Sequence, residues 1–422
     1  MAGKIYAEIY GCSASLADGE IALGLMRDSG YQVTEDPAEA DVLLLVTCAV
    51  KKPTSDRMIS RMKRLSHYPG KLLVAGCMVT GEPERVRKTA PQALLIAPRD
   101  ITSITEILEG AHQDGGGVKL GYPRIRRNPV ISVIPVSEGC RWSRCSFCIV
   151  PKTRPGYRSY PIQLVLDEVR AGLREGIREY WLTSQDMGSY GVESGRNLLP
   201  LLVRSVDSLE GEFLVRIGMM NPIYLKPIVA DLVDAFKGRH IFKFLHLPVQ
   251  SGSEYVLKTM SRGHSVSLFE EIVQAFRAEI PAITLSTDII VGYPTEDEED
   301  FEDTLRLVER VKPDVVNISR FFPRPGTSAE GMKTLPPKIL SRRVNLLRDV
   351  VSRVQLELNS RWIGWEGPAL VDERGRNSLM VARNSHYKPI VLNTTENLLG
   401  RFVWVRVTDY SHHYLRGEVV NG

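Results

Sequence analysis

The first hundred residues alternate short apolar runs with stretches of helical periodicity. The apolar runs 4–10, 41–47 and 71–75 predict strands, and the segments 14–29 and 54–65 between them predict helices. Strand–helix alternation of this kind predicts a parallel sheet with helices on its faces. We therefore expect an N-terminal α/β domain.

The same alternation resumes on a larger scale after residue 130. Six apolar runs predict strands at 131–137, 179–183, 213–218, 242–247, 282–291 and 315–321. Helical patterns separate most of them, as at 162–175 and 298–311. Six βα units fit a barrel or partial barrel, whose active site lies at the carboxyl ends of its strands. An open doubly wound sheet has the same periodicity and stays open as an alternative.

The last part of the chain has few helix signals. Strand-like segments at 367–372, 379–383, 389–392 and 403–408 are separated by Gly, Asn and Asp turns, which predicts a small all-β barrel. Residues 113–117, Gln-Asp-Gly-Gly-Gly, have the composition of a flexible linker. The predicted fold class is α/β, with a parallel-sheet N-terminal domain, a partial (βα)6 barrel and a C-terminal small β-barrel. The three predicted domains span residues 1–118, 128–356 and 360–422.

Composition narrows the class of protein. The chain has 422 residues, 43% hydrophobic and 25% charged, which are ordinary globular values. Its net charge of +4 is too small to identify a nucleic-acid partner by itself. The N-terminus lacks the pattern of a signal peptide, and the apolar run 42–50 is too short to span a bilayer. We expect a cytoplasmic protein with no membrane segment.

The six cysteines fall into two groups. Cys12, Cys48 and Cys77 each come just beyond a predicted strand of the first domain. The carboxyl ends of parallel strands form the edge of a sheet where ligands bind, so these three side chains can converge there. A long chain without a signal peptide favours free thiols or metal ligands over disulfides.

The second group lies on one loop. Cys140, Cys145 and Cys148 follow the first strand of the predicted barrel. Three thiolates can hold three irons of a [4Fe-4S] cluster and leave the fourth iron open for a ligand. A structural zinc site needs a fourth Cys or His nearby, and the neighbouring residues supply none. The pattern favours a cluster over zinc.

The cysteine triad, with an aromatic residue before its last member, resembles that of the radical S-adenosylmethionine superfamily. Later strand ends carry matching motifs: LTSQD at 182–186, RIGMMNP at 216–222, HLPVQSG at 246–252 and DIIVGYP at 288–294. Together with the three early cysteines, these resemble the methylthiotransferase family, and the terminal barrel is similar to its RNA-binding TRAM domain. One feature departs from the family pattern, since C-x4-C-x2-C stands here in place of C-x3-C-x2-C.

The resemblance implies a division of labour between two [4Fe-4S] clusters. Cys140, Cys145 and Cys148 are expected to bind the cluster whose open iron chelates S-adenosylmethionine. An electron from a donor such as ferredoxin or flavodoxin then cleaves this cofactor to a radical, which removes hydrogen from carbon 2 of an adenine. Cys12, Cys48 and Cys77 are expected to bind a second cluster carrying the sulfur for the methylthio group, which a sulfur donor supplies.

The strand-end motifs also predict contacts to S-adenosylmethionine. Gln185 and Asp186 can accept hydrogen bonds from the methionine amino group, and Arg216 can pair with its carboxylate. The Gly292 turn allows the backbone to approach the adenosine. For each of these, a polar residue that satisfies the loop backbone is the alternative. The predicted set is completed by Phe147, Gln250 and Asp288, whereas His246 on an apolar strand is expected to be structural.

Clustered basic residues predict an RNA partner. Two basic runs border the two cysteine groups, and a third set is interleaved with aromatic residues in the terminal barrel. The runs are Lys51, Lys52, Arg57, Arg61, Lys63 and Arg64; Arg141, Arg144, Lys152, Arg154 and Arg158; and Arg374, Arg376, Arg383, Lys388, Arg401, Arg406 and Arg416 with Tyr387, Trp404 and Tyr414. Solvated charge is the alternative for any single run.

The segments around the early cysteines indicate a branch of the family. YGCSASL at 10–16, TCAVKKP at 47–53 and AGCMVTG at 75–81 resemble the archaeal and eukaryotic branch, which acts on N6-threonylcarbamoyladenosine at position 37 in the anticodon stem-loop of tRNA. Related branches modify isopentenyladenosine in tRNA or an aspartate of a ribosomal protein. A metal-containing RNA-binding protein without catalysis is the alternative of another class.

Overall fold

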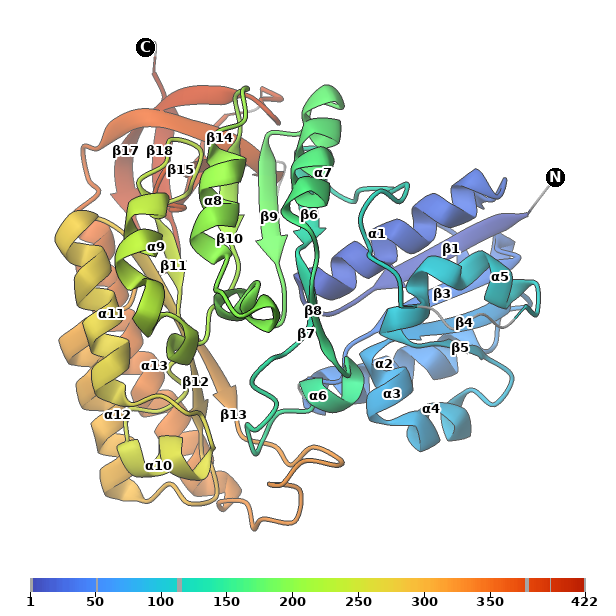
Figure 1. The fold of residues 1–422 in the computed structure, drawn as a ribbon, viewed down its shortest axis with the longest axis horizontal. Helices are drawn as coiled ribbons and strands as arrows, with labels where there is room; N and C mark the ends of the chain where they lie inside the picture. Colours follow the sequence, from blue (N-terminus) through green and yellow to red (C-terminus); the bar gives the residue numbers. More distant parts are fainter. Residues whose placement is uncertain (1–2, 51, 112–115, 376–378, 395, 421–422) are drawn as a thin grey trace.

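The computed structural model describes residues 3–50, 52–111, 116–375, 379–394 and 396–420. Three bodies follow one another along the chain in Figure 1, an N-terminal sheet, a central barrel and a C-terminal barrel. The predicted fold class is confirmed in all three. The boundaries that we predicted between the domains, at 118–128 and 356–360, remain a proposal.

The N-terminal sheet is parallel and has the strand order β2-β1-β3-β4-β5. Its strands are β1 Lys4–Ile9, β2 Gln32–Val33, β3 Val42–Thr47, β4 Lys71–Gly76 and β5 Leu94–Ile96. This order is that of a flavodoxin-like doubly wound sheet, in which ligands bind at the reversal between the first and third strands. The edge strands β2 and β5 were not predicted, since two or three residues are too short to show a periodicity.

Helices cover both faces of this sheet. They are α1 Ser13–Asp28, α2 Lys52–Leu65, α3 Cys77–Gly81, α4 Pro83–Thr89 and α5 Ile104–Leu108, with 3-10 turns at Pro37–Glu39 and Pro98–Ser103. Every residue of β3 is buried, as expected for a central strand with helices on both faces. Helix α1 also packs against the central barrel, which brings the N-terminal end of α1 to the barrel strands.

The central barrel has six parallel strands in chain order. They are β6 Ile131–Pro135, β9 Glu179–Thr183, β10 Leu214–Ile217, β11 Phe244–His246, β12 Thr284–Val291 and β13 Val315–Arg320. β6-β9-β10 and β11-β12-β13 form two sheets, which an isolated bridge from Val215 to Ile241 joins. Because neighbours in space are neighbours in sequence, the partial barrel is confirmed and the doubly wound alternative is wrong here. The predicted strand 131–137 is shorter than expected, since β7 Ser137–Gly139 leaves the barrel to pair with β8 Tyr157–Ser159.

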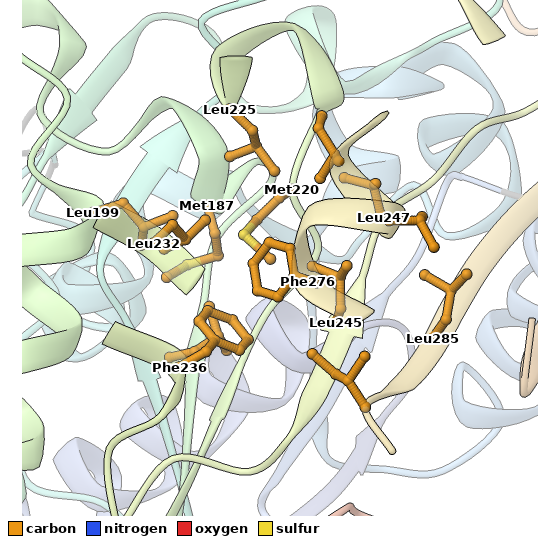
Figure 2. Close-up of a cluster of buried hydrophobic side chains, with 14 of the residues drawn as sticks. Met187, Leu199, Met220, Leu225, Leu232, Phe236, Leu245, Leu247, Phe276 and Leu285 are labelled. Atoms are coloured by element: carbon orange, nitrogen blue, oxygen red, sulfur yellow. The ribbon is translucent and has the colours of Figure 1, made fainter. Parts of the chain in front are cut away.

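Amphipathic helices enclose the barrel. They are α6 Val150–Thr153, α7 Ile162–Arg174, α8 Leu199–Asp207, α9 Val229–Phe236, α10 Glu254–Thr259, α11 Val266–Glu279, α12 Glu298–Val311 and α13 Pro337–Ser360. Figure 2 shows part of the core between helices and strands, where the rings of Phe236 and Phe276 meet edge to face at 5.1 Å beside Leu245 and Leu285. This packing joins the helices and the barrel strands in one apolar core.

The C-terminal region is a closed barrel in the order β14-β15-β16-β18-β17. Its strands are β14 Glu366–Arg374, β15 Met380–Asn384, β16 Pro389–Leu392, β17 Phe402–Tyr410 and β18 Leu415–Val419. β18 was not predicted, since only Leu415 and Gly417 of its five residues are buried. Within the residues described, no helix has the length and apolar content needed to span a bilayer.

Candidate active site

A cavity of about 530 Å³ lies at the carboxyl ends of the barrel strands. Cysteines from both predicted groups line it, Cys12 from the N-terminal sheet and Cys140, Cys145 and Cys148 from the loop. Other predicted residues share this lining, namely Phe147, Gln185, Asp186, Arg216, His246, Gln250 and Asp288. Gly292 does not line the cavity, and its backbone N–H donates to Glu296 at 3.0 Å. Its predicted contact with adenosine stays a prediction.

Three adjacent strands position the N-terminal cysteines. Cys12 follows β1 and caps α1, Cys48 follows β3, and Cys77 begins α3 directly after β4. Gly76 allows this turn, because its φ is +93° and a Cβ there would lie 2.6 Å from the Thr47 carbonyl oxygen. Burial raises the pKa of the Cys48 thiol to about 11, and the nearby Cys77 and Cys12 thiols add to the shift. The three cysteines thus lie at the carboxyl ends of adjacent strands, the edge of the sheet at which we expect them to converge.

Two buried arginines lie beside this group. Arg154 donates to Glu138 at 2.6 Å and to Asp18, and its charge opposes the rise that burial causes in the pKa of Cys77. Arg324 donates to Glu82 and lowers the pKa of Cys48 against the larger effect of burial. Positive charge near a thiol favours the thiolate, which is the form that binds iron.

The loop of the second group is anchored at its aromatic and serine residues. The Trp142 indole N–H donates to the Ser261 carbonyl at 2.8 Å, and the Ser146 N–H donates to the Met260 carbonyl at 3.0 Å. The Trp142 ring packs so closely on Gly263 that a Cβ there would lie 2.3 Å from it. The longer spacing between Cys140 and Cys145 therefore includes a residue that fixes the loop to the segment after α10.

Charge and burial affect the loop thiols as well. Burial raises the pKa of Cys148 to about 11 and also raises that of Cys140. Arg262 donates a hydrogen bond from Nη1 to the Cys145 sulfur at 3.4 Å. Each cysteine group thus has a buried cation in contact, and none of Arg154, Arg262 and Arg324 was predicted as a site residue.

Two acceptor atoms beside the loop have no donor. Gln185 Oε1 and Asp186 Oδ2 are buried and lack a hydrogen-bond partner among the described residues. The other oxygen of Asp186 accepts from the backbone N–H groups of Asn221 at 2.8 Å and Gly188 at 3.0 Å. Buried acceptors without donors fit a ligand that carries N–H groups, such as an ammonium.

His246 and Arg216 occupy the next layer toward the amino ends of the strands. His246 Nε2 lies 3.2 Å from Asp288 Oδ2, a contact that suits its predicted structural role. The Arg216 guanidinium lies within 5.1 Å of the Trp181 ring, 5.3 Å of the Phe244 ring and 5.4 Å of the Tyr387 ring.

The donor sets suit iron–sulfur clusters. All six cysteines are free thiols, three in each group. Three thiols are the set that holds a [4Fe-4S] cluster with one open iron. Across the described ranges, no group of three or more Cys, His, Asp or Glu side chains has the spacing of a single-ion site.

The basic residues divide into exposed and buried ones. The exposed ones of the first two runs are Lys52, Arg57, Lys63, Arg64, Arg141, Arg144, Lys152 and Arg158, and Lys52 also lines the cavity. Four others that we expected on an RNA-facing surface are held in ion pairs, the partly exposed Arg61 with Glu8 and Arg383 with Asp372, and the buried Arg154 with Asp18 and Lys388 with Asp314. Lys51 and Arg376 lie outside the described residues.

The C-terminal barrel keeps an exposed aromatic and basic face. Trp404 is 43% exposed on β17, next to the exposed Arg406, and Arg374, Arg401 and Arg416 are exposed as well. Tyr387 is in contrast packed against Phe242 and Phe244 of the central barrel. A stacking surface for RNA is therefore limited to the outer strands.

Three family models match the chain in succession. Uncharacterized protein family UPF0004 matches residues 4–97, the radical SAM superfamily matches 134–308, and the TRAM domain matches 363–420. The matches correspond to the N-terminal sheet, the central barrel and the C-terminal barrel.

Curated relatives match over the whole chain. A protein of Methanothermobacter thermautotrophicus named probable threonylcarbamoyladenosine tRNA methylthiotransferase is 39% identical over 98% of this chain and 99% of its own length. One of Pyrococcus horikoshii with the same name is 35% identical over 99% of both chains. The Homo sapiens threonylcarbamoyladenosine tRNA methylthiotransferase is 32% identical over 99% of this chain and 74% of its own length.

Solved structures support the fold. The radical S-adenosylmethionine methyltransferase TsrM of Kitasatospora setae, solved with tryptophan and an S-adenosylmethionine analogue, superposes with a TM-score of 0.58 at 16% identity. The match covers 78% of this chain and 75% of TsrM. At this identity the likeness concerns the fold alone.

Proposed function

The chain belongs to the threonylcarbamoyladenosine tRNA methylthiotransferases, a family of radical S-adenosylmethionine enzymes, and on that premise we propose that it converts N6-threonylcarbamoyladenosine at tRNA position 37 to its 2-methylthio derivative. The observation that carries the proposal is the cavity in which Cys12 meets Cys140, Cys145 and Cys148. A methylthio transfer needs a radical source and a sulfur carrier close together, and Cys12 of the N-terminal group borders one cavity with all three loop cysteines, whereas Cys48 and Cys77 lie outside its lining.

We assign one [4Fe-4S] cluster to each group of three cysteines. When bound, the loop cluster and S-adenosylmethionine supply the radical that removes hydrogen from carbon 2, and the second cluster supplies the sulfur. Arg262, Arg154 and Arg324 stabilise the thiolates. Gln185 and Asp186 are the proposed acceptors for the methionine ammonium, because both hold a buried oxygen without a donor.

The remaining cofactor contacts are proposed from the cavity lining. Phe147 shields the loop cysteines from water, and Gln250 and Asp288 offer polar groups at the ends of their strands. Gly292 lies outside this lining, and its proposed approach to the adenosine requires the ligand to extend beyond the cavity.

We propose the anticodon stem-loop as the part of tRNA that covers the cavity. The exposed cations of the two basic runs, of which Lys52 lines the cavity, neutralise phosphates, and Trp404 offers a stacking surface on the C-terminal barrel. A low-potential donor such as ferredoxin or flavodoxin and a separate sulfur donor complete the set of partners. The free thiols suit a reducing compartment, which supports a cytoplasmic location.

The test is mass spectrometry of tRNA nucleosides from cells with and without this protein. We expect 2-methylthio-N6-threonylcarbamoyladenosine only in cells with the intact chain and not in cells with Cys140→Ala. A methylthio group on isopentenyladenosine instead would keep the chemistry and overturn the substrate. No change in any tRNA nucleoside, from protein that carries both clusters, would overturn the proposed function and favour a ribosomal-protein substrate.

A further inference from the structure

A second cavity lies beneath the first, toward the amino ends of the barrel strands. Its volume is about 550 Å³, and we call it the lower cavity. On β12 its lining residue Ser286 precedes Asp288 of the first cavity, and on β13 Asn317 precedes Ser319. Helix α1 and the C-terminal barrel close its sides, so that all three parts of the chain contribute to its wall.

The two cavities adjoin at one layer of side chains. Trp181, Arg216 and His246 line both of them. A ligand that reacts in the upper cavity can therefore extend a substituent past this layer into the lower one.

The aromatic rings around Arg216 hold its guanidinium toward the lower cavity. Of the three rings within 5.4 Å, those of Phe244 and Tyr387 line the lower cavity and not the upper one. The Trp181 ring lies across the boundary, at 5.1 Å. Cation–π contacts from three sides fix the position of the charge and leave the N–H groups at its edge without an acceptor.

Arg216 lacks an anionic partner in the protein. No hydrogen bond or ion pair joins it to any of the residues described, and its Nε atom is buried without a partner. A half-buried guanidinium with unused donors is costly unless a ligand accepts from it. The group whose geometry matches the guanidinium fork is a carboxylate.

The rest of the lining is suited to a polar ligand. Asn317 and Ser286 offer hydrogen-bonding groups, and Arg127 has no ion pair within the described part of the chain. Arg383 is held by Asp372 at 2.7 Å and so is not available to a ligand. An apolar substituent such as an isopentenyl group would leave the Arg216 and Asn317 groups unsatisfied.

On the basis of the proposed function, we propose that the lower cavity binds the threonylcarbamoyl substituent of the target adenosine and that Arg216 pairs with its carboxylate. Carbon 2 and the N6 substituent occupy different ring carbons, so a base whose carbon 2 faces the cysteines directs its N6 arm away from them. Arg216 is then a specificity-determining residue. The other carboxylate that fits Arg216 is that of the methionine part of S-adenosylmethionine, which we expected from the sequence to pair with it.

The test measures RNA binding by the unreduced holoenzyme with S-adenosylmethionine present. Two anticodon stem-loops are compared, one with N6-threonylcarbamoyladenosine and one with the methyl ester of its carboxylate, because their phosphate contacts are identical. We expect the intact protein to bind the acid about 10- to 100-fold more tightly than the ester. Arg216→Gln should bind both alike, Arg216→Lys should keep part of the preference, and Arg353→Gln, an exposed change on α13, should keep all of it.

Equilibrium dialysis of S-adenosylmethionine distinguishes the two carboxylates. An unchanged dissociation constant in Arg216→Gln supports the proposal. A weakened constant together with an unaltered acid preference would overturn it and assign Arg216 to methionine. Equal binding of acid and ester by the intact protein would also overturn it. The proposed function has a separate test. It fails if the bound stem-loop with the free carboxylate acquires no methylthio group after the enzyme is reduced.

Discussion

Cys12, Cys48 and Cys77 follow three different strands, whereas Cys140, Cys145 and Cys148 share one loop. The first group needs the whole parallel sheet, because β1, β3 and β4 must lie side by side before their ends can meet. The second group needs only nine residues of chain and the anchors that Trp142 and Ser146 make to the segment after α10. One site thus depends on tertiary structure and the other mainly on local structure.

The charges beside the two groups differ in the same way. Arg154 and Lys119 share Asp18 and Glu138 in a buried network that joins α1 to the central barrel. Arg262 reaches Cys145 from a segment of the barrel itself. The three cysteines at the strand ends therefore depend on the packing of the N-terminal domain against the central barrel. The three loop cysteines depend on the barrel alone.

The largest expected effect separates the two groups by function. Cys140→Ala should lower reductive cleavage of S-adenosylmethionine by more than about 100-fold, since even outer contacts of a metal site cost 10- to 100-fold. Cys48→Ala should retain this cleavage and lose methylthio transfer. Chromatography of 5′-deoxyadenosine and mass spectrometry of the RNA measure the two activities. Equal loss of cleavage in both variants would mean that the groups do not act separately.

The next effect tests the dependence on the buried network. Burial alone raises the pKa of Asp18, but the charges of Arg154 and Lys119 outweigh it and hold that pKa below its usual value. The ionised carboxylate therefore stabilises the fold above its ordinary pKa, and this contribution is lost as the pH falls through the lower, folded-state value. Asp18→Asn should lower the free energy of unfolding by about 3–5 kcal/mol at pH 7. The variant should also no longer lose stability through this group as the pH falls.

Urea unfolding between pH 3 and pH 7 measures the effect of Asp18→Asn. Asp28→Asn is the matched control on the same helix, because Asp28 is exposed and its one ion pair among the described residues is with Arg27 at 2.9 Å. We expect the control to keep the stability and the pH dependence of the intact protein. A similar loss in both variants would show that the network does not stabilise the junction.

A smaller effect concerns the loop. Trp142→Ala removes both the hydrogen bond to Ser261 and the packing on Gly263, and should slow cleavage of S-adenosylmethionine by about 10- to 100-fold. Trp142→Phe keeps most of the packing and should lose less. Iron content and electron paramagnetic resonance should show loss from the loop cluster only. Loss from both clusters would contradict the local character of this group.

The sequence predicted the elements that carry the cysteines, because periodicity and strand ends are local features. It placed both ends of β9 and of β16 where the structure has them and assigned the family correctly. The sequence could not predict which charged side chains are buried. Arg154 stands in a basic run, and only folding brings it to Asp18, 136 residues away.

The same limit applies to the boundary between the cavities. Arg216 stands in a strand-end motif, which shows that it is near the site but not which way it faces. Its direction depends on Phe244 and on Tyr387, a residue of the C-terminal barrel. Long-range packing of this kind leaves no periodic signal in a single sequence.

The smallest effect we predict is at the direct contact between the two regions. Ser13 follows Cys12 on α1, and its hydroxyl lies 2.7 Å from that of Thr183 at the end of β9. Ser13→Ala and Thr183→Val should each cost about 1 kcal/mol, and the double variant less than their sum, because the pair shares one hydrogen bond. Urea unfolding of the four proteins gives the coupling energy. A coupling near zero would mean that the Asp18 network alone, without this contact, holds the N-terminal cysteines (Cys12, Cys48 and Cys77) next to the barrel. The distance between the two groups of thiols would then depend on whether Asp18 is ionised, and therefore on pH.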